Sequence, residues 1–234
     1  MKNILITGAT GDLGKDLSLK LAKEGYNLFL TSTNLNKLNN LKRKIQKNYP
    51  LTKISVLDFD LTKIDQIKNL QLEYFKNFRS IYALINLAGI FRIKNLDNED
   101  INEILDMFKI NVISPIIITK YFLEKLKNNK NTKIINLCSS SSYEGFKDTS
   151  IYCSTKHALL GFNKSMQDEL RKYNVQCISI SPGSIKGKMT KVIKNQDRKT
   201  FLKTKDITNL ISYVLCLNSN MTLNELKLNR LVYR

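Results

Sequence analysis

The sequence predicts an α/β fold in which helices cover both faces of a parallel β-sheet. Short apolar segments of strand length alternate with longer amphipathic segments of helix length along the 234 residues. The strand segments are apolar almost throughout, as is typical of strands buried on both faces. Because crossovers between parallel strands are right-handed, the alternation favours a doubly wound sheet of the Rossmann type with three layers, α/β/α.

The first half of the chain is expected to contain four strands and three helices. The strands are placed at 4–7, 27–31, 53–57 and 81–86, and the helices at 12–24, 35–48 and 63–76. Gly25 ends the first helix, since glycine readily adopts the left-handed conformation of a C′ residue. The second helix ends before Pro50, because proline disfavours a helical conformation in the residue that precedes it.

The second half is expected to open with a long helix from about 101 to 128, in which Pro115 causes a kink or a break. Strands at 133–138, 175–180 and near 223–228 alternate with helices at 151–173 and 206–217. No repeat or linker divides the chain. We therefore expect one Rossmann-type domain over 1–234, with a cofactor half at about 1–90 and a catalytic and substrate half at about 91–234.

The composition argues against a membrane or metal-binding protein. No apolar run approaches the ~20 residues of a membrane span, and the N-terminus enters a strand without a signal-peptide pattern. The four cysteines form no C-x-x-C pair and the chain has one histidine, His157, so we expect no metal site. These features predict a cytoplasmic protein with free thiols, in which Cys138 and Cys177 are buried.

The formal charge of +18 is the feature that most invites a nucleic-acid or membrane partner. The lysines, however, are spread along every helix, and only 120–133 and 187–205 are locally dense in basic residues. This distribution favours a generally basic surface that steers an anionic small molecule. We expect neither nucleic acid nor a membrane as the main partner.

A glycine-rich stretch follows the first strand and leads into the first helix. Here glycines allow a tight turn, and the backbone N–H groups and the helix N-terminus favour a pyrophosphate. The alternative is a simple strand-to-helix turn, which the position between strand and helix makes the weaker interpretation. The residues predicted to hold the cofactor are Gly8, Thr10, Gly11, Asp12, Leu13 and Gly14.

The end of the second strand favours NADP(H) over NAD(H). A carboxylate that would hold a ribose 2′-OH is missing there, and Ser32, Thr33 and Asn34 can donate hydrogen bonds to a 2′-phosphate. No arginine is present in this turn, so NAD(H) stays possible. Asp60 and Leu61 follow the third strand and are candidates for the adenine amino group. For Asp60 the alternative is an N-cap of the helix at 63–76.

Tyr152 and Lys156 carry the expected chemistry. They are four residues apart at the start of a helix and share one face. A phenol with a pKa of about 10 is a poor base, and a nearby ammonium is expected to lower that pKa so that Tyr152 serves as acid and base. Ser139 is expected to hold and polarise the substrate oxygen, with Ser140 as the alternative.

Taken together, these motifs resemble the short-chain dehydrogenase/reductase family over nearly the whole chain. Ser139 precedes Tyr152 by thirteen residues, and Asn111 precedes Ser139 by twenty-eight, as in the family's catalytic tetrad. The resemblance implies that Asn111 binds a water that links Lys156 to solvent. It also implies a homodimer or homotetramer formed through 101–128 and 151–173. Further cofactor contacts that it implies are Asn86, Ala88, Gly89, Tyr152, Lys156, Pro182, Gly183 and Ile185.

Three positions depart from the family pattern. Asp12 replaces a glycine of the compact subclass, which makes the spacing of Gly8, Gly11 and Gly14 similar to that of the extended subclass. Leu87 replaces a frequent asparagine. The usual threonine after Pro182-Gly183 is missing where Lys186-Gly187 stands, and Thr190 is the candidate to replace it.

The resulting hypothesis is an oxidoreductase that transfers hydride between NADP(H), or NAD(H), and a carbonyl or secondary alcohol. Substrate contacts are expected from 140–151 and 184–205, and the lysines of the second segment suit an anionic substrate, unless they only form a solvated basic helix. The alternatives are a nucleotide-sugar-modifying or other enzyme on the same scaffold, and a non-catalytic NAD(P)-sensing protein.

Overall fold

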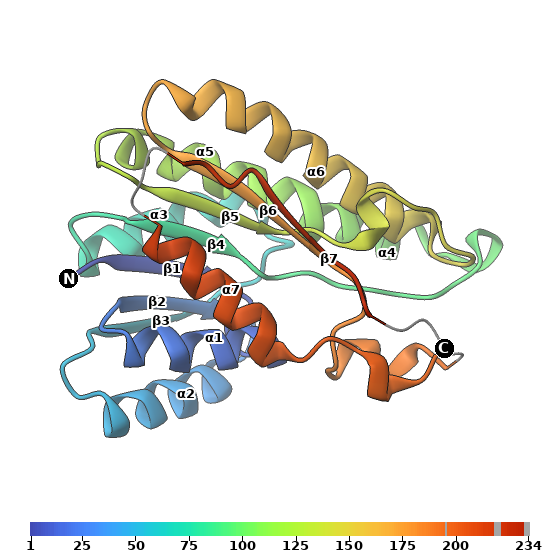
Figure 1. Ribbon diagram of the computed structural model, residues 1–234, viewed down its shortest axis with the longest axis horizontal. Helices are drawn as coiled ribbons and strands as arrows, with labels where there is room; N and C mark the ends of the chain where they lie inside the picture. The colour runs from blue at the N-terminus through green and yellow to red at the C-terminus, as the bar shows by residue number, and fades with distance from the viewer. Residues whose placement is uncertain (195, 218–220, 232–234) are drawn as a thin grey trace.

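Seven parallel strands form one continuous sheet in the computed structural model, which describes residues 1–194, 196–217 and 221–231 (Figure 1). The strand order is β3-β2-β1-β4-β5-β6-β7. Because β1 pairs with both β2 and β4, the order reverses between β1 and β4, and ligands of such sheets bind at the carboxyl ends of these strands. The strands are β1 (Asn3–Thr7), β2 (Asn27–Ser32), β3 (Ile54–Asp58), β4 (Ala83–Asn86), β5 (Lys133–Leu137), β6 (Gln176–Pro182) and β7 (Glu225–Leu228).

Helices cover both faces of the sheet (Figure 1). Alternate strand residues point to opposite faces: Ile4 and Ile6 pack into one apolar core, and Leu5 packs into the other. The first core holds α1 (Asp12–Lys23), α2 (Leu35–Asn48) and α7 (Thr204–Cys216), and the second holds α3 (Ile67–Asn77), α5 (Ser114–Lys127) and α6 (Ser150–Arg171). The predicted doubly wound, three-layer fold is confirmed.

The ends of the first helices follow from local chemistry that the sequence shows. Gly25 has φ +83°, the left-handed conformation that was predicted to end α1. Asn34 is the N-cap of α2, since its side chain accepts a hydrogen bond from the backbone N–H of Lys37 at 2.9 Å. The expected helix at 63–76 begins with one 3₁₀ turn, Ile64–Gln66, before α3.

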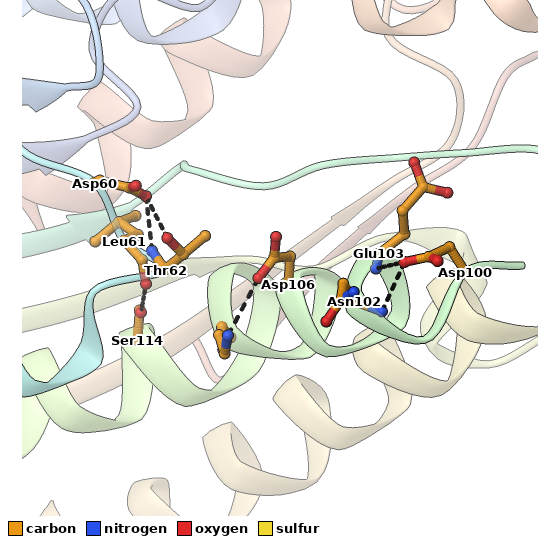
Figure 2. A network of polar contacts seen from close by, with 9 residues as sticks. Asp60, Leu61, Thr62, Asp100, Asn102, Glu103, Asp106 and Ser114 are labelled. Atoms are coloured by element: carbon orange, nitrogen blue, oxygen red, sulfur yellow. Dashed lines mark hydrogen bonds and ion pairs between the residues drawn. The ribbon is translucent and has the colours of Figure 1, made fainter.

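The long helix expected at 101–128 is interrupted, as predicted, in the turn that precedes Pro115. Asp100 is the N-cap of α4 (Ile101–Phe108), as Figure 2 shows, and a π-helical turn at Lys109–Ile113 separates α4 from α5. Pro115 lies in the first turn of α5, directly after the π-turn, and it has no N–H to donate to the carbonyl groups of that turn. The interruption is therefore a π-turn that ends just before the proline, a feature frequent at functional sites.

Five 3₁₀ turns complete the secondary structure of the described residues: Ile64–Gln66, Leu96–Asn98, Ser140–Ser142, Met189–Val192 and Arg198–Thr200. The segment after β6 is thus built of short turns, where the sequence suggested a basic helix. None of the helices in the described ranges combines the length and the apolar character that a membrane span needs. Cys138 and Cys177 are buried, as expected.

A buried lysine joins the sheet to α7 at the amino ends of the strands, opposite their carboxyl ends. The Lys133 side chain is fully buried, and its ammonium donates to the carbonyl oxygen of Leu217 at 3.0 Å and to the Tyr82 hydroxyl at 3.5 Å. Tyr82 in turn donates to the carbonyl oxygen of Leu215 at 2.5 Å. Desolvation, with a smaller contribution from Lys2, lowers the pKa of Lys133 to about 8.

We expect Lys133→Met to reveal this pKa through the pH dependence of stability. In the folded chain Lys133 releases its proton near pH 8, whereas an unfolded lysine does so near pH 10.4. The unfolded state therefore binds more protons between these values, and the wild-type protein gains stability relative to the variant as the pH rises. Urea unfolding at pH 8 and pH 10 should show a relative gain of roughly 2 kcal/mol. A difference that is independent of pH would contradict the assignment.

Candidate active site

A cavity of about 510 Å³ opens at the carboxyl edge of the sheet. Its walls come from the β1–α1 loop, the loops after β4 and β5, the start of α6, and the segment after β6. Most of the predicted site residues line it together. These are Gly8, Gly11, Asp12, Leu13, Gly14, Gly89, Ser139, Tyr152, Lys156, Pro182, Gly183 and Ile185.

Two glycines of the glycine-rich loop are needed because backbone segments approach each other closely at these positions. A Cβ on Gly14 would lie 2.3 Å from the carbonyl oxygen of Gly8. Gly8 has φ +69°, and a Cβ there would lie 2.8 Å from the backbone of Ala88. The Ala88 N–H also donates to the Thr7 hydroxyl at 3.3 Å, which holds the first and fourth strand ends together. These contacts require glycine at both positions.

The loop leaves the N-terminus of α1 open towards the cavity. Gly11 is the N-cap and has no side chain to satisfy the first N–H groups of the helix. Asp12, Leu13 and Gly14 form the first turn, and all three line the cavity. A helix N-terminus of this kind attracts phosphate groups. The cradle therefore fits the diphosphate of a dinucleotide.

The residues predicted at the adenosine end lie outside the cavity. Asn34 accepts the backbone N–H of Lys37, and the Ser32 hydroxyl accepts the N–H of Asn34 at 3.3 Å. The amide hydrogens of Asn34 and the hydroxyl hydrogen of Ser32 are not used in these bonds. Thr10 and Thr33 also lie outside the cavity.

Asp60 and Leu61 hold the loop after β3 in place (Figure 2). The Asp60 carboxylate accepts the backbone N–H of Thr62 at 2.9 Å and its hydroxyl at 2.8 Å. It caps this turn and not α3, so the N-cap interpretation is wrong. The Leu61 side chain packs in the core, and its carbonyl oxygen accepts the Ser114 hydroxyl at 2.5 Å. A contact of either residue with adenine stays a prediction.

Asn86 and Ala88 also serve the scaffold. The Asn86 side chain is 2% exposed and donates to the Asn136 side chain at 2.8 Å, while Asn136 donates to Asn163 on α6 at 2.8 Å. This chain of buried amides joins β4 and β5 to α6. Neither Asn86 nor Ala88 lines the cavity, so any cofactor contact that they make stays a prediction.

Ser139, Tyr152 and Lys156 meet at one end of the cavity. The Ser139 hydroxyl lies near enough to the Tyr152 phenol to favour its charged form, and Ser140 lines the same cavity one residue on. The Lys156 ammonium lies 5.7 Å from the centre of the Tyr152 ring and donates to the carbonyl oxygen of Leu137 at 2.8 Å. Phe91 packs edge-on against the Tyr152 ring, with the ring centroids 4.7 Å apart. The phenol is thus held from two sides.

Asn111 lies in the π-turn and is 1% exposed. Its side-chain oxygen accepts the N–H of Ile90 at 2.8 Å, and its amide nitrogen donates to the carbonyl oxygen of Ile90 at 3.0 Å and to the Thr155 hydroxyl at 3.1 Å. A Cβ on Gly89 would lie 3.2 Å from the Asn111 oxygen and 3.7 Å from the Lys156 ammonium. The side chain therefore positions the loop after β4 next to Lys156, and its predicted role in binding a relay water stays a prediction.

The pKa of Tyr152 shifts in the direction opposite to the one expected from the sequence. Burial raises it to about 12, and the Ser139 hydroxyl opposes this shift only in part. Burial also lowers the pKa of Lys156, whose ammonium is held by the carbonyl oxygen of Leu137. Desolvation therefore outweighs the attraction between phenolate and ammonium that the spacing suggested. The phenol is protonated at neutral pH.

Sequence reasoning missed one part of the apolar walls of the cavity. The loop after β4, which contributes Phe91 and Ile93, was not expected, whereas Phe146, Met189 and Ile193 belong to the segments 140–151 and 184–205 that were expected to contact the substrate. Thr190 lines the cavity too, but its hydroxyl donates to the carbonyl oxygen of Ile185 at 2.7 Å. The His157 ring donates through Nδ1 to the carbonyl oxygen of Cys153 at 2.9 Å and lies outside the cavity, in keeping with a structural role.

Comparison with known proteins gives one consistent result. The family described as short chain dehydrogenase matches residues 2–198. An uncharacterized oxidoreductase of Staphylococcus aureus is 26% identical over 225 residues, which cover 96% of this chain and 95% of the relative. A second uncharacterized oxidoreductase, from Staphylococcus epidermidis, is 26% identical over 224 residues, with 96% and 95% covered.

Solved structures share the fold over the whole chain. An alcohol dehydrogenase from Thermococcus sibiricus, complexed with 5-hydroxy-NADP, superposes with a TM-score of 0.91 at 22% identity and covers 100% of this chain and 98% of its own. A metagenomic short-chain oxidoreductase in complex with NADP gives a TM-score of 0.86 at 20% identity, with 99% and 97% covered.

We expect Gly14→Ala and Gly11→Ala to differ sharply in stability. Both added methyl groups point at the carbonyl oxygen of Gly8, at 2.3 Å and 3.3 Å respectively. Gly14→Ala should therefore destabilise the fold by about 2–3 kcal/mol, since overpacking displaces backbone, and Gly11→Ala by less than about 1 kcal/mol, since only the N-cap preference changes. Urea unfolding of the ligand-free protein measures both. Equal losses would contradict the close approach at Gly14.

Proposed function

The chain belongs to the short-chain dehydrogenase family, and we propose that it is an NADP(H)-dependent oxidoreductase that interconverts a carbonyl compound and a secondary alcohol. The observation that supports this proposal is the convergence of Ser139, Tyr152 and Lys156 at one end of a cavity whose other end is the open N-terminus of α1. A sensing protein would bind the dinucleotide without needing this set of proton-transfer groups.

In this proposal Ser139 and Tyr152 hold the substrate oxygen between their two hydroxyl groups. Both residues line the cavity and the Ser139 hydroxyl acts on the Tyr152 phenol, so a carbonyl oxygen placed between them would meet both hydroxyl groups. Two donors aimed at one oxygen stabilise the negative charge that develops on it. Phe91 keeps the Tyr152 ring from turning away from this position.

Tyr152 gives its proton to the substrate oxygen in the reductive direction. The bound nicotinamide supplies or accepts the hydride. Because burial raises the pKa of Tyr152 to about 12, the phenol carries its proton at neutral pH and is ready to donate it. Lys156 lies on the side of Tyr152 that faces Leu137 and Gly89 and would return a proton to it from there. We therefore propose that Tyr152 enters the reductive direction as the protonated phenol.

The cofactor is proposed to be NADP(H). The open turn at Ser32, Thr33 and Asn34 presents hydroxyl and amide hydrogens and no carboxylate, which favours a 2′-phosphate. The structural relatives in complex with 5-hydroxy-NADP and NADP support this choice.

The substrate is proposed to be a small molecule with an apolar body. Phe91, Ile93 and Phe146 form apolar walls beside the reacting groups. Lys186 and Lys194 also line the cavity and would favour a substrate that carries a negative charge.

Tyr152→Phe should abolish turnover while NADPH still binds. Phenylalanine keeps the edge-on contact with Phe91 and removes only the hydroxyl, so the loss of general acid and oxyanion stabilisation should reduce kcat by about 10³-fold or more. Turnover is measured at the nicotinamide absorbance with a panel of ketones and aldehydes, and NADPH binding by its fluorescence. Unchanged turnover in the variant would refute the mechanism.

Ser32→Asp should move the cofactor preference from NADPH towards NADH. A carboxylate at this strand end repels a 2′-phosphate and can accept the hydrogen bond of a 2′-OH. Dissociation constants for both cofactors, measured side by side on the wild type and the variant, give the preference. Thr33→Ser, which keeps a hydroxyl and adds no charge, is the matched control. A wild-type preference for NADH would overturn the NADP(H) proposal.

A further inference from the structure

Two departures from the family pattern, Asp12 and Gly187, are in contact. The Asp12 carboxylate on the first turn of α1 accepts the backbone N–H of Lys188 at 2.5 Å. A Cβ on Gly187 would lie 2.8 Å from the same carboxylate oxygen. The backbone after β6 therefore comes so close to Asp12 that a side chain at 187 would displace the Asp12 carboxylate. We call residues 185–192 the strap.

The strap is also attached to the segment at residues 198–202. Its first end is fixed by the N–H of Lys186, which donates to the carbonyl oxygen of Leu202 at 2.8 Å. The Arg198 guanidinium donates to the carbonyl oxygens of Gly187 at 3.0 Å and Thr190 at 2.6 Å. These bonds join the strap to residues 198–202, and the Lys188 N–H joins it to Asp12.

Asp12 attaches the strap to the glycine-rich loop, across the cavity. Gly187, Met189 and Thr190 of the strap line the cavity, and so do Gly11 and Asp12 on the opposite wall. The hydrogen bond from Lys188 to Asp12 is therefore a direct link between the two walls, at the end of the cavity where the diphosphate cradle lies.

The surroundings of Asp12 compensate for its charge. A second hollow beside the strap brings four lysines and one arginine around Asp12 and Asp16, namely Lys15, Lys186, Lys188, Lys191 and Arg198. The N-terminus of α1 also favours a negative charge at this position. A carboxylate next to the diphosphate cradle is thus tolerated electrostatically, and what Asp12 contributes in addition is the bond to the strap.

We propose that Asp12 is a positioning residue that clasps the strap to the glycine-rich loop in the ligand-free protein and slows the release of the bound dinucleotide. The first half of this proposal stands on the contacts alone. The second half rests on the proposed function, because it requires that the cavity binds NADPH.

Limited trypsin digestion of the ligand-free protein tests the clasp. Lys186, Lys188 and Lys191 are cleavage sites within the strap, and the fragments that end there are identified by mass. Asp12→Ala should increase the rate of strap cleavage about tenfold, the upper end of the factor expected when one hydrogen bond is lost. Asp12→Asn keeps an acceptor oxygen of the same reach and should stay within about twofold of the wild type.

The clasp can also be broken from its other side. Gly187 has no positive φ, so alanine is compatible with its backbone, and Gly187→Ala should act only through its contact with Asp12. It should increase strap cleavage as Asp12→Ala does, and the double variant should be no more sensitive than either single variant. Asp16→Ala is the matched control. It removes a carboxylate of the same hollow that bonds Thr204, beyond the strap, and should leave the cleavage rate unchanged.

Three digestion results would overturn the clasp. They are wild-type cleavage rates in both Asp12→Ala and Gly187→Ala, additive effects in the double variant, and equal sensitivity of Asp12→Asn and Asp12→Ala. The last result would show that charge matters and the bond does not.

Release of NADPH, followed by stopped-flow fluorescence, tests the second half. Asp12→Ala and Gly187→Ala should release it about fivefold to tenfold faster than the wild type, and Asp12→Asn at the wild-type rate. Unchanged or slower release would overturn this half. If the wild type binds neither NADPH nor NADH, the proposed function fails, and the digestion result still decides whether the clasp exists.

Discussion

The side chain of Asn111 is the contact on which the geometry of the site depends. It pairs with both backbone polar groups of Ile90 and with the Thr155 hydroxyl, and so joins the loop after β4, the α4–α5 segment and α6. A buried amide that loses such partners is costly, because each unpaired group keeps its desolvation penalty. Gly89 and Lys156 lie directly beside this amide. Asn111 therefore sets the distance between the loop after β4 and Lys156, and it can do so without touching a ligand.

Much of the fold could be predicted because its signals are local. Gly25 ends α1, Asn34 caps α2, and the apolar strands alternate with helices at the expected spacing. The grouping of Ser139, Tyr152 and Lys156 could also be expected, since each follows or begins an element whose position the alternation gives. What could not be predicted depends on packing between distant segments. The contact of Asp12 with Lys188 joins residues 176 positions apart, and no local pattern reveals it.

The pKa of Tyr152 shows the same limit in electrostatic terms. The sequence shows that a lysine is one helical turn away, but not that both groups are desolvated or that the ammonium is engaged by the carbonyl oxygen of Leu137. Spacing gives the sign of a pairwise attraction, whereas burial is a property of the whole fold. A similar lesson comes from Lys133, which sequence alone places at the start of an ordinary strand and the structure places, fully buried, beneath α7.

The π-turn at Lys109–Ile113 has a consequence for how this chain can change. A π-turn amounts to one extra residue within an α-helix. Deleting any one of its five residues would restore a regular helix and would look harmless in a comparison of lengths. The flanking helices would keep their phase, because the wider turn absorbs the extra residue, but the residues of the turn would shift and the Asn111 amide would lose its place beside Ile90 and Thr155. Residues around Asn111 can therefore be substituted, but the number of residues in the π-turn is fixed for as long as Asn111 sets the geometry of the site.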